Sequence, residues 1–356
     1  MEDPRKIAAL YLFLKRNSRQ NARRRRSWIH QVNQQRNQLG EFHCLLQELR
    51  LDDDRFQRYL RLTVAQFDDL LGRIGPRISR QDTNYRRSIS ASERLSICLR
   101  YLATGDSFRT IANSFRVGVS TLCLRLQLLS GTHLMANMLS LKPPPSQDYK
   151  GTYSLVLLAV VDANYCFRVI DVGGYGRTSD GGILANSTFG QALRAGTLPL
   201  PADQTLPGAD HRGPQPHAFV ADEAFPLRKN LMRPFPGRNI PRERKIFNYR
   251  LSRARMVVED AFGILSSQWR MYRRAMEVRV DVAEKCVKAT CVLHNFLRHT
   301  STTARVNNPT AEVEPLPGLG RVAANYSGRE AIRVREVFTS YFSAEGAVPW
   351  QDSRLS

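Results

Sequence analysis

The run from Tyr153 to Val161 constrains the fold most strongly, because it is almost continuously apolar. A run of this length, rich in Val and Leu, predicts a strand that is buried on both faces. The next residues, Asp162–Tyr165, predict a turn, and Phe167–Gly173 predicts a second strand. The two strands together predict a β-hairpin. A third, shorter strand is expected at Ala218–Ala221.

Helical periodicity dominates on both sides of these strands. Before them, Thr63 is expected to cap a helix that is broken at Gly75-Pro76, and Ser90 to cap one that ends at Gly105. After them, helices are expected at Tyr249–Trp269 and Val282–Leu297, with an amphipathic segment at Arg329–Phe342. The pattern predicts an α/β fold in which a mixed sheet is flanked by helices and preceded by an all-α domain.

The end of the all-α region resembles a helix-turn-helix. A short helix at Phe108–Phe115 is followed by the connector Arg116–Val119 and by a helix capped at Ser120. In this arrangement Ser120, Thr121 and Arg125 would face the edges of DNA bases. The alternative is a pair of packed helices that contacts no DNA.

The charge of the chain favours a polyanionic partner. Lys and Arg number 53 against 32 acids, which gives a formal net charge of +21. Such an excess favours salt-sensitive binding to the phosphates of nucleic acid. The alternatives are a merely soluble basic protein or one that binds acidic partners. Arg23, Arg24, Arg25 and Arg26 form a basic run that could contact phosphates or direct nuclear import, or could be a solvated arm.

The cysteines point to a reducing compartment. None of the six forms a C-x-x-C pair, so neither a zinc site nor a secreted disulfide framework is expected. We expect reduced thiols, which suit the nucleus or the cytoplasm. No apolar stretch approaches the length of a membrane span, so no membrane association is expected.

Three acids could hold a divalent metal ion. Asp222 follows the third predicted strand, Glu259 lies on the predicted helix Tyr249–Trp269, and Asp180 lies in a Gly-rich turn. Carboxylates are the ligands that Mg²⁺ or Mn²⁺ prefers, and such ions can drive phosphodiester cleavage. Each acid also has a structural alternative. Glu259 could pair with Arg255, Asp180 could cap a helix, and Asp222 could stabilise a turn.

Several motifs resemble the Harbinger-type transposases of the DDE class and the nucleases derived from them. The resemblance covers roughly residues 27 to 298 and is carried by Tyr149–Ala163, Gly176–Gly182, Asp222–Leu227, Phe247–Glu259 and Cys291–Arg298. It implies an RNase H-like catalytic domain that uses Mg²⁺ or Mn²⁺ to cut DNA. It maps catalytic, metal-binding acids onto Asp222 and Glu259 and an accessory metal ligand onto Asp180. Arg253 and Arg255, in the same stretch as Glu259, are then expected to contact DNA.

The resemblance fails at the first catalytic acid. Leu129–His133 fits the motif that carries this acid, but Ser130 stands where the aspartate is expected. A hydroxyl is a poor substitute for a carboxylate that bridges metals. Ser120 and Gly131 are also too close in sequence for a full helix and a strand. A skipped exon, a gene-model error or decay of a domesticated copy would each account for both features.

The expected organisation has four parts: a basic helical segment (1–60), a helix-turn-helix-like domain (61–130), a nuclease domain shortened at its start (131–300) and a tail with one helix (301–356). Two functions remain open, an impaired DNA endonuclease and a non-catalytic DNA-binding or protein-interaction module. The family implies DNA and a Myb-like protein as partners and the nucleus as the location. Oligomerisation and a cytoplasmic pool are left open.

Overall fold

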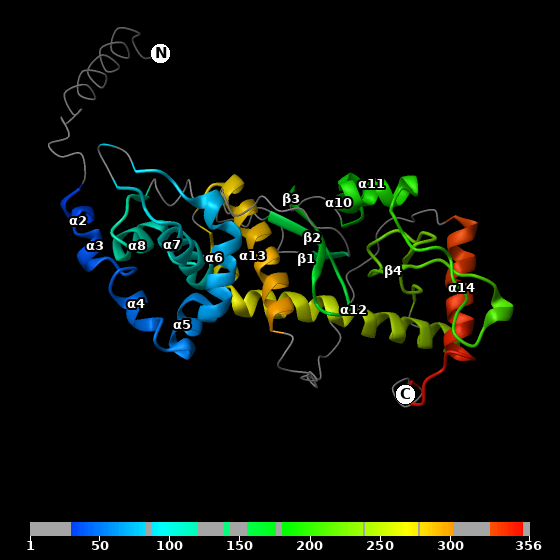
Figure 1. Cartoon of the computed structure of the whole chain (residues 1–356). Coiled ribbons are helices and arrows are strands. Elements are labelled where there is room, and N and C mark those ends of the chain that lie inside the picture. The colour runs from blue at the N-terminus through cyan, green and yellow to red at the C-terminus, as the bar shows by residue number, and fades with distance from the viewer. Residues whose placement is uncertain are drawn as a thin grey trace, which may run out of the picture.

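The computed structural model describes residues 30–82, 84, 87–119, 138–141, 155–175, 180–237, 239–276, 278–301 and 328–351. Helices gather at one end of the molecule, a small sheet lies in the middle, and the last helix stands at the far end (Figure 1). The structure is therefore of mixed α and β composition, as the sequence predicts. The four-part division remains a prediction.

The helical end contains seven helices within the described residues. They are α2 (Gln31–Gln34), α3 (Arg36–Leu39), α4 (Leu45–Leu49), α5 (Asp53–Leu60), α6 (Val64–Ile78), α7 (Ala91–Thr104) and α8 (Phe108–Ser114). The predicted caps are confirmed: Thr63 Oγ1 accepts from Gln66 N at 3.2 Å, and Ser90 Oγ accepts from Glu93 N at 3.1 Å. These contacts satisfy backbone N–H groups that have no partner within their helices.

The predicted break at Gly75-Pro76 is wrong. Helix α6 continues through Pro76 to Ile78. Pro76 lies in the last turn, so it removes only one hydrogen bond near the helix end. Ile78 is buried, and the Ser79 N–H donates to the Gly75 carbonyl at 2.9 Å. Burial of Ile78 and this closing hydrogen bond favour one further helical turn.

The predicted hairpin is confirmed. Strand β2 (Leu155–Val161) pairs antiparallel with β3 (Phe167–Tyr175), and the turn is held by Asp162 Oδ1, which accepts from Asn164 N and Cys166 N at 2.9 and 3.0 Å. A strand that the sequence did not predict, β1 (Met138–Leu141), pairs antiparallel with the other edge of β2. Strand β2 is therefore central in the sheet, as its apolar run requires.

The third predicted strand is confirmed at β4 (Phe219–Val220), but it belongs to a different sheet. It pairs in parallel with β5 (Leu231–Met232), and the order of the larger sheet is β1-β2-β3. Among the described residues, parallel and antiparallel pairings thus occur in separate sheets rather than in one mixed sheet. An RNase H-like fold stays a prediction.

The remaining helices surround the two sheets. They are α10 (Asp180–Asn186), α11 (Thr188–Ala195), η1 (Asp210–Arg212), α12 (Arg242–Gln268), η2 (Arg270–Arg273), α13 (Val280–Thr300) and α14 (Arg329–Ser343). Helix α12 begins seven residues before the predicted start and, at 1.5 Å per residue, is about 40 Å long. It runs along the bottom of the view in Figure 1, from the helical end to α14.

One face of α12 builds the largest core. The predicted stripe is confirmed, since Val258, Phe262, Leu265 and Trp269 are at most 6 % exposed. The same core cluster contains residues of α5, α6, α7, β2 and α13. The helical end and the central sheet therefore share one apolar interior.

The turn between β2 and β3 is fastened to α13. Asn295 Oδ1 accepts from the Phe167 N–H at 2.8 Å, and its amide donates to the Phe167 carbonyl at 2.6 Å. His294 Nε2 donates to the Tyr165 carbonyl at 2.7 Å. These contacts fix the sheet relative to α13.

Candidate active site

Asp222 lies in a tight turn directly after β4. Its Oδ1 accepts from the Ala224 N–H at 2.9 Å, and its carbonyl accepts from the Phe225 N–H at 3.3 Å. Phe225 and Leu227, which follow, are 3 % exposed and anchor the turn in two different clusters of the core. The half-buried carboxylate is therefore held in a fixed position. Asp222 also stabilises the turn, which is the structural alternative that the sequence offers for it.

Glu259 lies on the solvent side of α12, beside the buried Val258. Its side chain is 51 % exposed and accepts from Arg255 Nη2 at 3.4 Å, one helical turn away. The ion pair that was the structural alternative for Glu259 is thus formed. An exposed pair of this kind contributes only about 0.3–0.5 kcal/mol.

Asp180 begins α10, and a glycine brings that helix to the Asp222 turn. A Cβ atom placed on Gly181 would lie 3.3 Å from the Ala224 carbonyl oxygen. The backbone of α10 therefore approaches the turn more closely than most side chains would permit. This approach places Asp180 in the neighbourhood of Asp222.

The pKa of Asp222 also indicates that Asp180 lies nearby. Burial raises the pKa of the Asp222 carboxyl above its usual value, and the negative charges of Asp180 and Glu223 raise it further. The Ala224 N–H and the Arg255 guanidinium oppose this shift. Burial has the largest effect on the pKa.

Arg255 is the side chain that links the predicted acids. It pairs with Glu259 on its own helix and acts electrostatically on Asp222, which in turn interacts with Asp180. The structure thus places Asp180 near Asp222, and Arg255 connects this pair of acids to Glu259. We call these four residues the acid–arginine cluster.

The donor atoms of this cluster suit a hard divalent ion, but their arrangement does not. Carboxylate oxygens are appropriate ligands for Mg²⁺ or Mn²⁺. Within the ranges that the structure describes, however, no three His, Cys, Asp or Glu side chains come together as metal ligands would. The guanidinium of Arg255 already forms an ion pair with Glu259. The described residues therefore do not fit a metal ion bound by all three acids.

The predicted DNA contacts have different outcomes. Several of the predicted contacts lie outside the described residues, namely Arg23–Arg26, Ser120, Thr121, Arg125 and Ser130. The helix predicted at Phe108–Phe115 is present as α8, and the helix-turn-helix stays a prediction. The Arg253 guanidinium lies 4.3 Å from the centre of the Trp350 ring, in a cation–π contact with the C-terminal segment. Contacts of Arg253 and Arg255 with DNA stay predictions.

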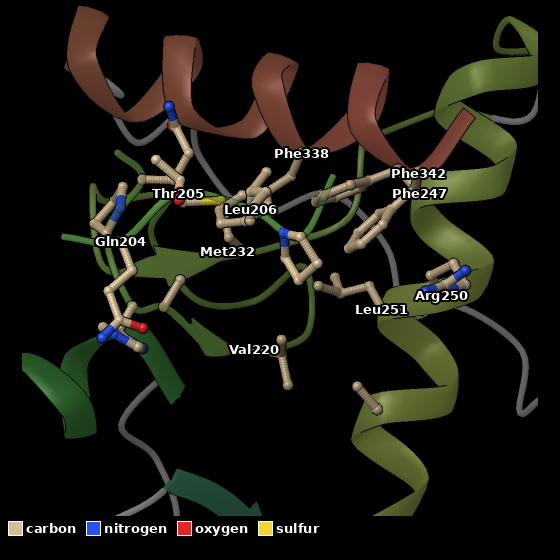
Figure 2. Close-up of a pocket in the computed structure, with 16 residues that line it drawn as sticks. Gln204, Thr205, Leu206, Val220, Met232, Phe247, Arg250, Leu251, Phe338 and Phe342 are labelled. Carbon is tan, nitrogen blue, oxygen red and sulfur yellow. The ribbon is translucent and has the colours of Figure 1, made fainter. Parts of the chain in front are cut away.

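A largely apolar pocket of about 490 Å³ lies among α12, α14 and the β4 segment. Figure 2 shows its walls: α12 contributes Phe247 and Leu251, α14 contributes Phe338 and Phe342, and Val220 comes from β4. Val220 and the lining residue Ala254 are close in sequence to Asp222 and Arg255. No acid is among the described residues that line the pocket.

The sequence did not reveal the positioning roles of two residues. Gly181 belongs to the Gly-rich turn around Asp180, and Asn295 belongs to a motif that carries the family resemblance. Neither spacing nor hydrophobic period reveals a hydrogen bond between residues 128 positions apart. One signal in the sequence could have indicated a further basic site. A short basic run, Arg270, Arg273 and Arg274, closely follows the end of α12.

Comparison with known proteins finds a similarity to nucleases in this part of the chain. Residues 145–295 match the sequence profile of the DDE superfamily endonuclease. The chain is also 22 % identical over 297 residues to a protein from Arabidopsis thaliana named "Protein ALP1-like". The aligned region covers 69 % of this chain and 71 % of that protein. No solved structure matches. Asp180, Asp222 and Glu259 lie inside the matched region, whereas Ser130 precedes it.

No helix within the described ranges is long and apolar enough to cross a membrane.

Proposed function

We propose that the chain is a Harbinger-type, transposase-derived DNA endonuclease whose capacity to cleave phosphodiester bonds is impaired. The observation that carries the proposal is the acid–arginine cluster. Asp180 interacts electrostatically with Asp222, and Arg255 links Asp222 to Glu259, all within the region that is similar to DDE superfamily endonucleases. A half-buried carboxylate with a raised pKa and a charged partner on a neighbouring helix is typical of functional sites.

Within this proposal Asp222 and Glu259 are the catalytic acids and Asp180 is an accessory ligand. Mg²⁺ or Mn²⁺ is the cofactor that such a set of acids would require. Two features support impairment. Ser130 offers no carboxylate at the expected first position, and Arg255 pairs with Glu259 in the arrangement that the structure describes.

The second candidate function is a non-catalytic DNA-binding or protein-interaction module. The formal net charge of +21 favours it, because binding to DNA phosphates needs no catalytic acids. DNA is the proposed partner in both cases, together with a Myb-like protein that would supply target recognition. We propose a nuclear location, and the sequence leaves a cytoplasmic pool and an oligomer open.

We expect the purified full chain to nick supercoiled plasmid DNA in Mg²⁺ or Mn²⁺ no faster than its Glu259→Ala variant. The physical reason is that an incomplete set of carboxylates cannot hold the ions that stabilise the attacking and leaving oxygens. The measurement is the conversion of supercoiled to open-circular plasmid over time.

Glu243→Ala provides the matched control, because Glu243 is an exposed acid on the same helix but outside the cluster. Metal-dependent nicking that Glu259→Ala abolishes and Glu243→Ala leaves intact would refute the impairment and establish an active nuclease. DNA binding without nicking, with an affinity that falls as salt rises, would favour the non-catalytic module. Sequencing cDNA across Ser120–Gly131 would show whether a segment with an aspartate is missing.

A further inference from the structure

Six arginines line an open cleft between the helical end and the segment that follows α12. The cleft has a volume of about 470 Å³ and lies where the end of α5, the C-terminal half of α7 and η2 meet. Its arginines are Arg58, Arg61, Arg100, Arg270, Arg273 and Arg274. We call this feature the arginine cleft.

The backbone holds the floor of the cleft in place. Arg61 follows α5 in a left-handed conformation with φ of 69°, and its N–H donates to the Gln57 carbonyl at 2.7 Å. The Arg61 carbonyl accepts from Gln268 Nε2 at 2.7 Å, which ties this turn to the end of α12. The neighbours Leu60 and Leu62 are fully buried. Arg61 is therefore fixed beside η2 by interactions that do not involve its charge.

The charges in the cleft are poorly balanced by the protein. Asp106 is the single acid among the described residues that line it, and it pairs with Arg274 at 2.7 Å. Arg100 lies over the Tyr59 ring at 3.7 Å and donates to the Tyr59 carbonyl at 3.3 Å. No carboxylate within the described ranges forms an ion pair with Arg58, Arg61, Arg270 or Arg273.

Arg61 shows the consequence of this imbalance. Its Nε is buried and has no hydrogen-bond partner among the described residues. Burial lowers the pKa of the Arg61 guanidinium, and the nearby charges of Arg270, Arg100 and Arg273 lower it further. The guanidinium groups thus repel one another, and a bound anion would relieve this repulsion.

We propose that the arginine cleft binds the phosphate groups of a DNA backbone. Guanidinium groups suit this role because their planar donors match phosphate oxygens in pairs. Arg58, Arg270, Arg273 and Arg274 are exposed along the open cleft, while Arg61 and Arg100 lie deeper. A phosphodiester backbone can reach both sets, since the rim is open to solvent. The assignment rests on the proposed DNA-directed function and places a contact outside the acid–arginine cluster.

The test is the affinity of the full chain for a fluorescein-labelled DNA duplex, measured by anisotropy over a series of salt concentrations. Arg270→Gln/Arg273→Gln removes two exposed arginines of the cleft. We expect its affinity to fall on the order of tenfold and the slope of log K against log salt to shrink by about 2, one unit for each lost phosphate contact. Arg329→Gln/Arg333→Gln, on the exposed face of α14, is the control with the same change in charge.

A second variant gives a gain that misfolding cannot imitate. Asp106→Asn removes the acid that pairs with Arg274, so the cleft gains one net positive charge. We expect DNA to bind several-fold more tightly and with a steeper salt dependence. Melting curves of all variants establish that they are folded. If Arg270→Gln/Arg273→Gln does not fold, the DNA affinity of Asp106→Asn decides whether the cleft binds DNA.

The outcomes separate this proposal from the proposed function. If the wild-type chain binds DNA and the cleft variants bind it as tightly as the α14 control does, the cleft is not a DNA contact, but the DNA-directed function stands. A wild-type chain that binds no DNA would contradict both the cleft proposal and the proposed function. Sodium tripolyphosphate is the probe for a small anion. If it raises the melting temperature only when the cleft is intact, while DNA affinity is equal in both double variants, the cleft binds a small polyphosphate and the DNA assignment fails.

Discussion

Gly105→Ala is expected to lower the free energy of unfolding by about 3 kcal/mol, whereas Gly196→Ala should lower it by only about 1 kcal/mol. Both glycines end a helix in the left-handed region, Gly105 after α7 with φ of 68° and Gly196 after α11 with φ of 69°. In each case the glycine N–H closes the helix by donating to the carbonyl four residues earlier. The backbone strain of an alanine should therefore be nearly the same at the two positions.

The two sites differ in what surrounds the missing side chain. A Cβ atom on Gly105 would lie 2.8 Å from the Cα of Met271, whereas one on Gly196 would meet nothing within 4 Å. Met271 is fully buried, so η2 cannot move aside without disturbing the core. Urea unfolding followed by circular dichroism measures both costs. Equal losses would mean that α7 and η2 are not packed together.

This contact also supports the arginine cleft. Gly105 lies between the α7 residues Arg100 and Thr104 and the acid Asp106, all of which line the cleft, and its contact partner Met271 belongs to η2. A substitution that forces η2 away from α7 should therefore weaken DNA binding as well as stability. Gly196→Ala should leave DNA binding unchanged, because Gly196 does not line the cleft.

The parts of the fold that the sequence predicts are those set by local chemistry. Ser90 and Gly105 mark the ends of α7 because a hydroxyl can cap a helix start and a glycine can adopt the left-handed conformation at its end. The apolar run of β2 indicates its central place in the sheet for a similar reason: residues buried on both faces cannot alternate with polar ones. Pro76 misled the interpretation because its effect depends on how close it lies to the helix end.

The arrangement of the site depends on contacts that are distant in sequence. The acids Asp222 and Glu259 could be singled out from their local sequence, and their local contacts in a turn and an ion pair were foreseeable. That Arg255 would interact with both acids could not be foreseen, because it depends on how α12 lies against the β4 turn. The arginine cleft was missed for the same reason, since its residues come from three separate stretches of the chain.

A second large effect is expected when the pH falls. His294 is 2 % exposed, and burial lowers its pKa from 6.5 to about 4. The charge of Arg298 lowers this pKa too, while the hydrogen bond to the Tyr165 carbonyl opposes the shift. The ring donates through Nε2 to that carbonyl in either protonation state, so burial is the reason why the folded state favours the uncharged form.

Stability falls with pH because the unfolded chain binds a proton at His294 more readily than the folded chain does. Between pH 6.5 and about 4 the unfolded chain protonates His294 and the folded chain does not, so stability falls as the pH falls. The contribution is complete above pH 6.5 and is lost below the folded pKa. At 1.36 kcal/mol for each unit of pKa difference, His294 accounts for a loss of about 3 kcal/mol across this window.

His294→Gln isolates this contribution, because a glutamine amide can donate a hydrogen bond but does not titrate. The measurement is the free energy of unfolding in urea at a series of pH values from 7 to 4 for both proteins. Other shifted groups, such as Glu41 and Asp222, are present in both and cancel in the difference. The difference should be constant above pH 6.5 and should change by about 3 kcal/mol towards pH 4, in the direction that favours the variant.

A difference that does not depend on pH would mean that His294 is accessible to protons in the folded state. The contact between α13 and the β2–β3 turn would then be weaker than its 2.7 Å hydrogen bond indicates.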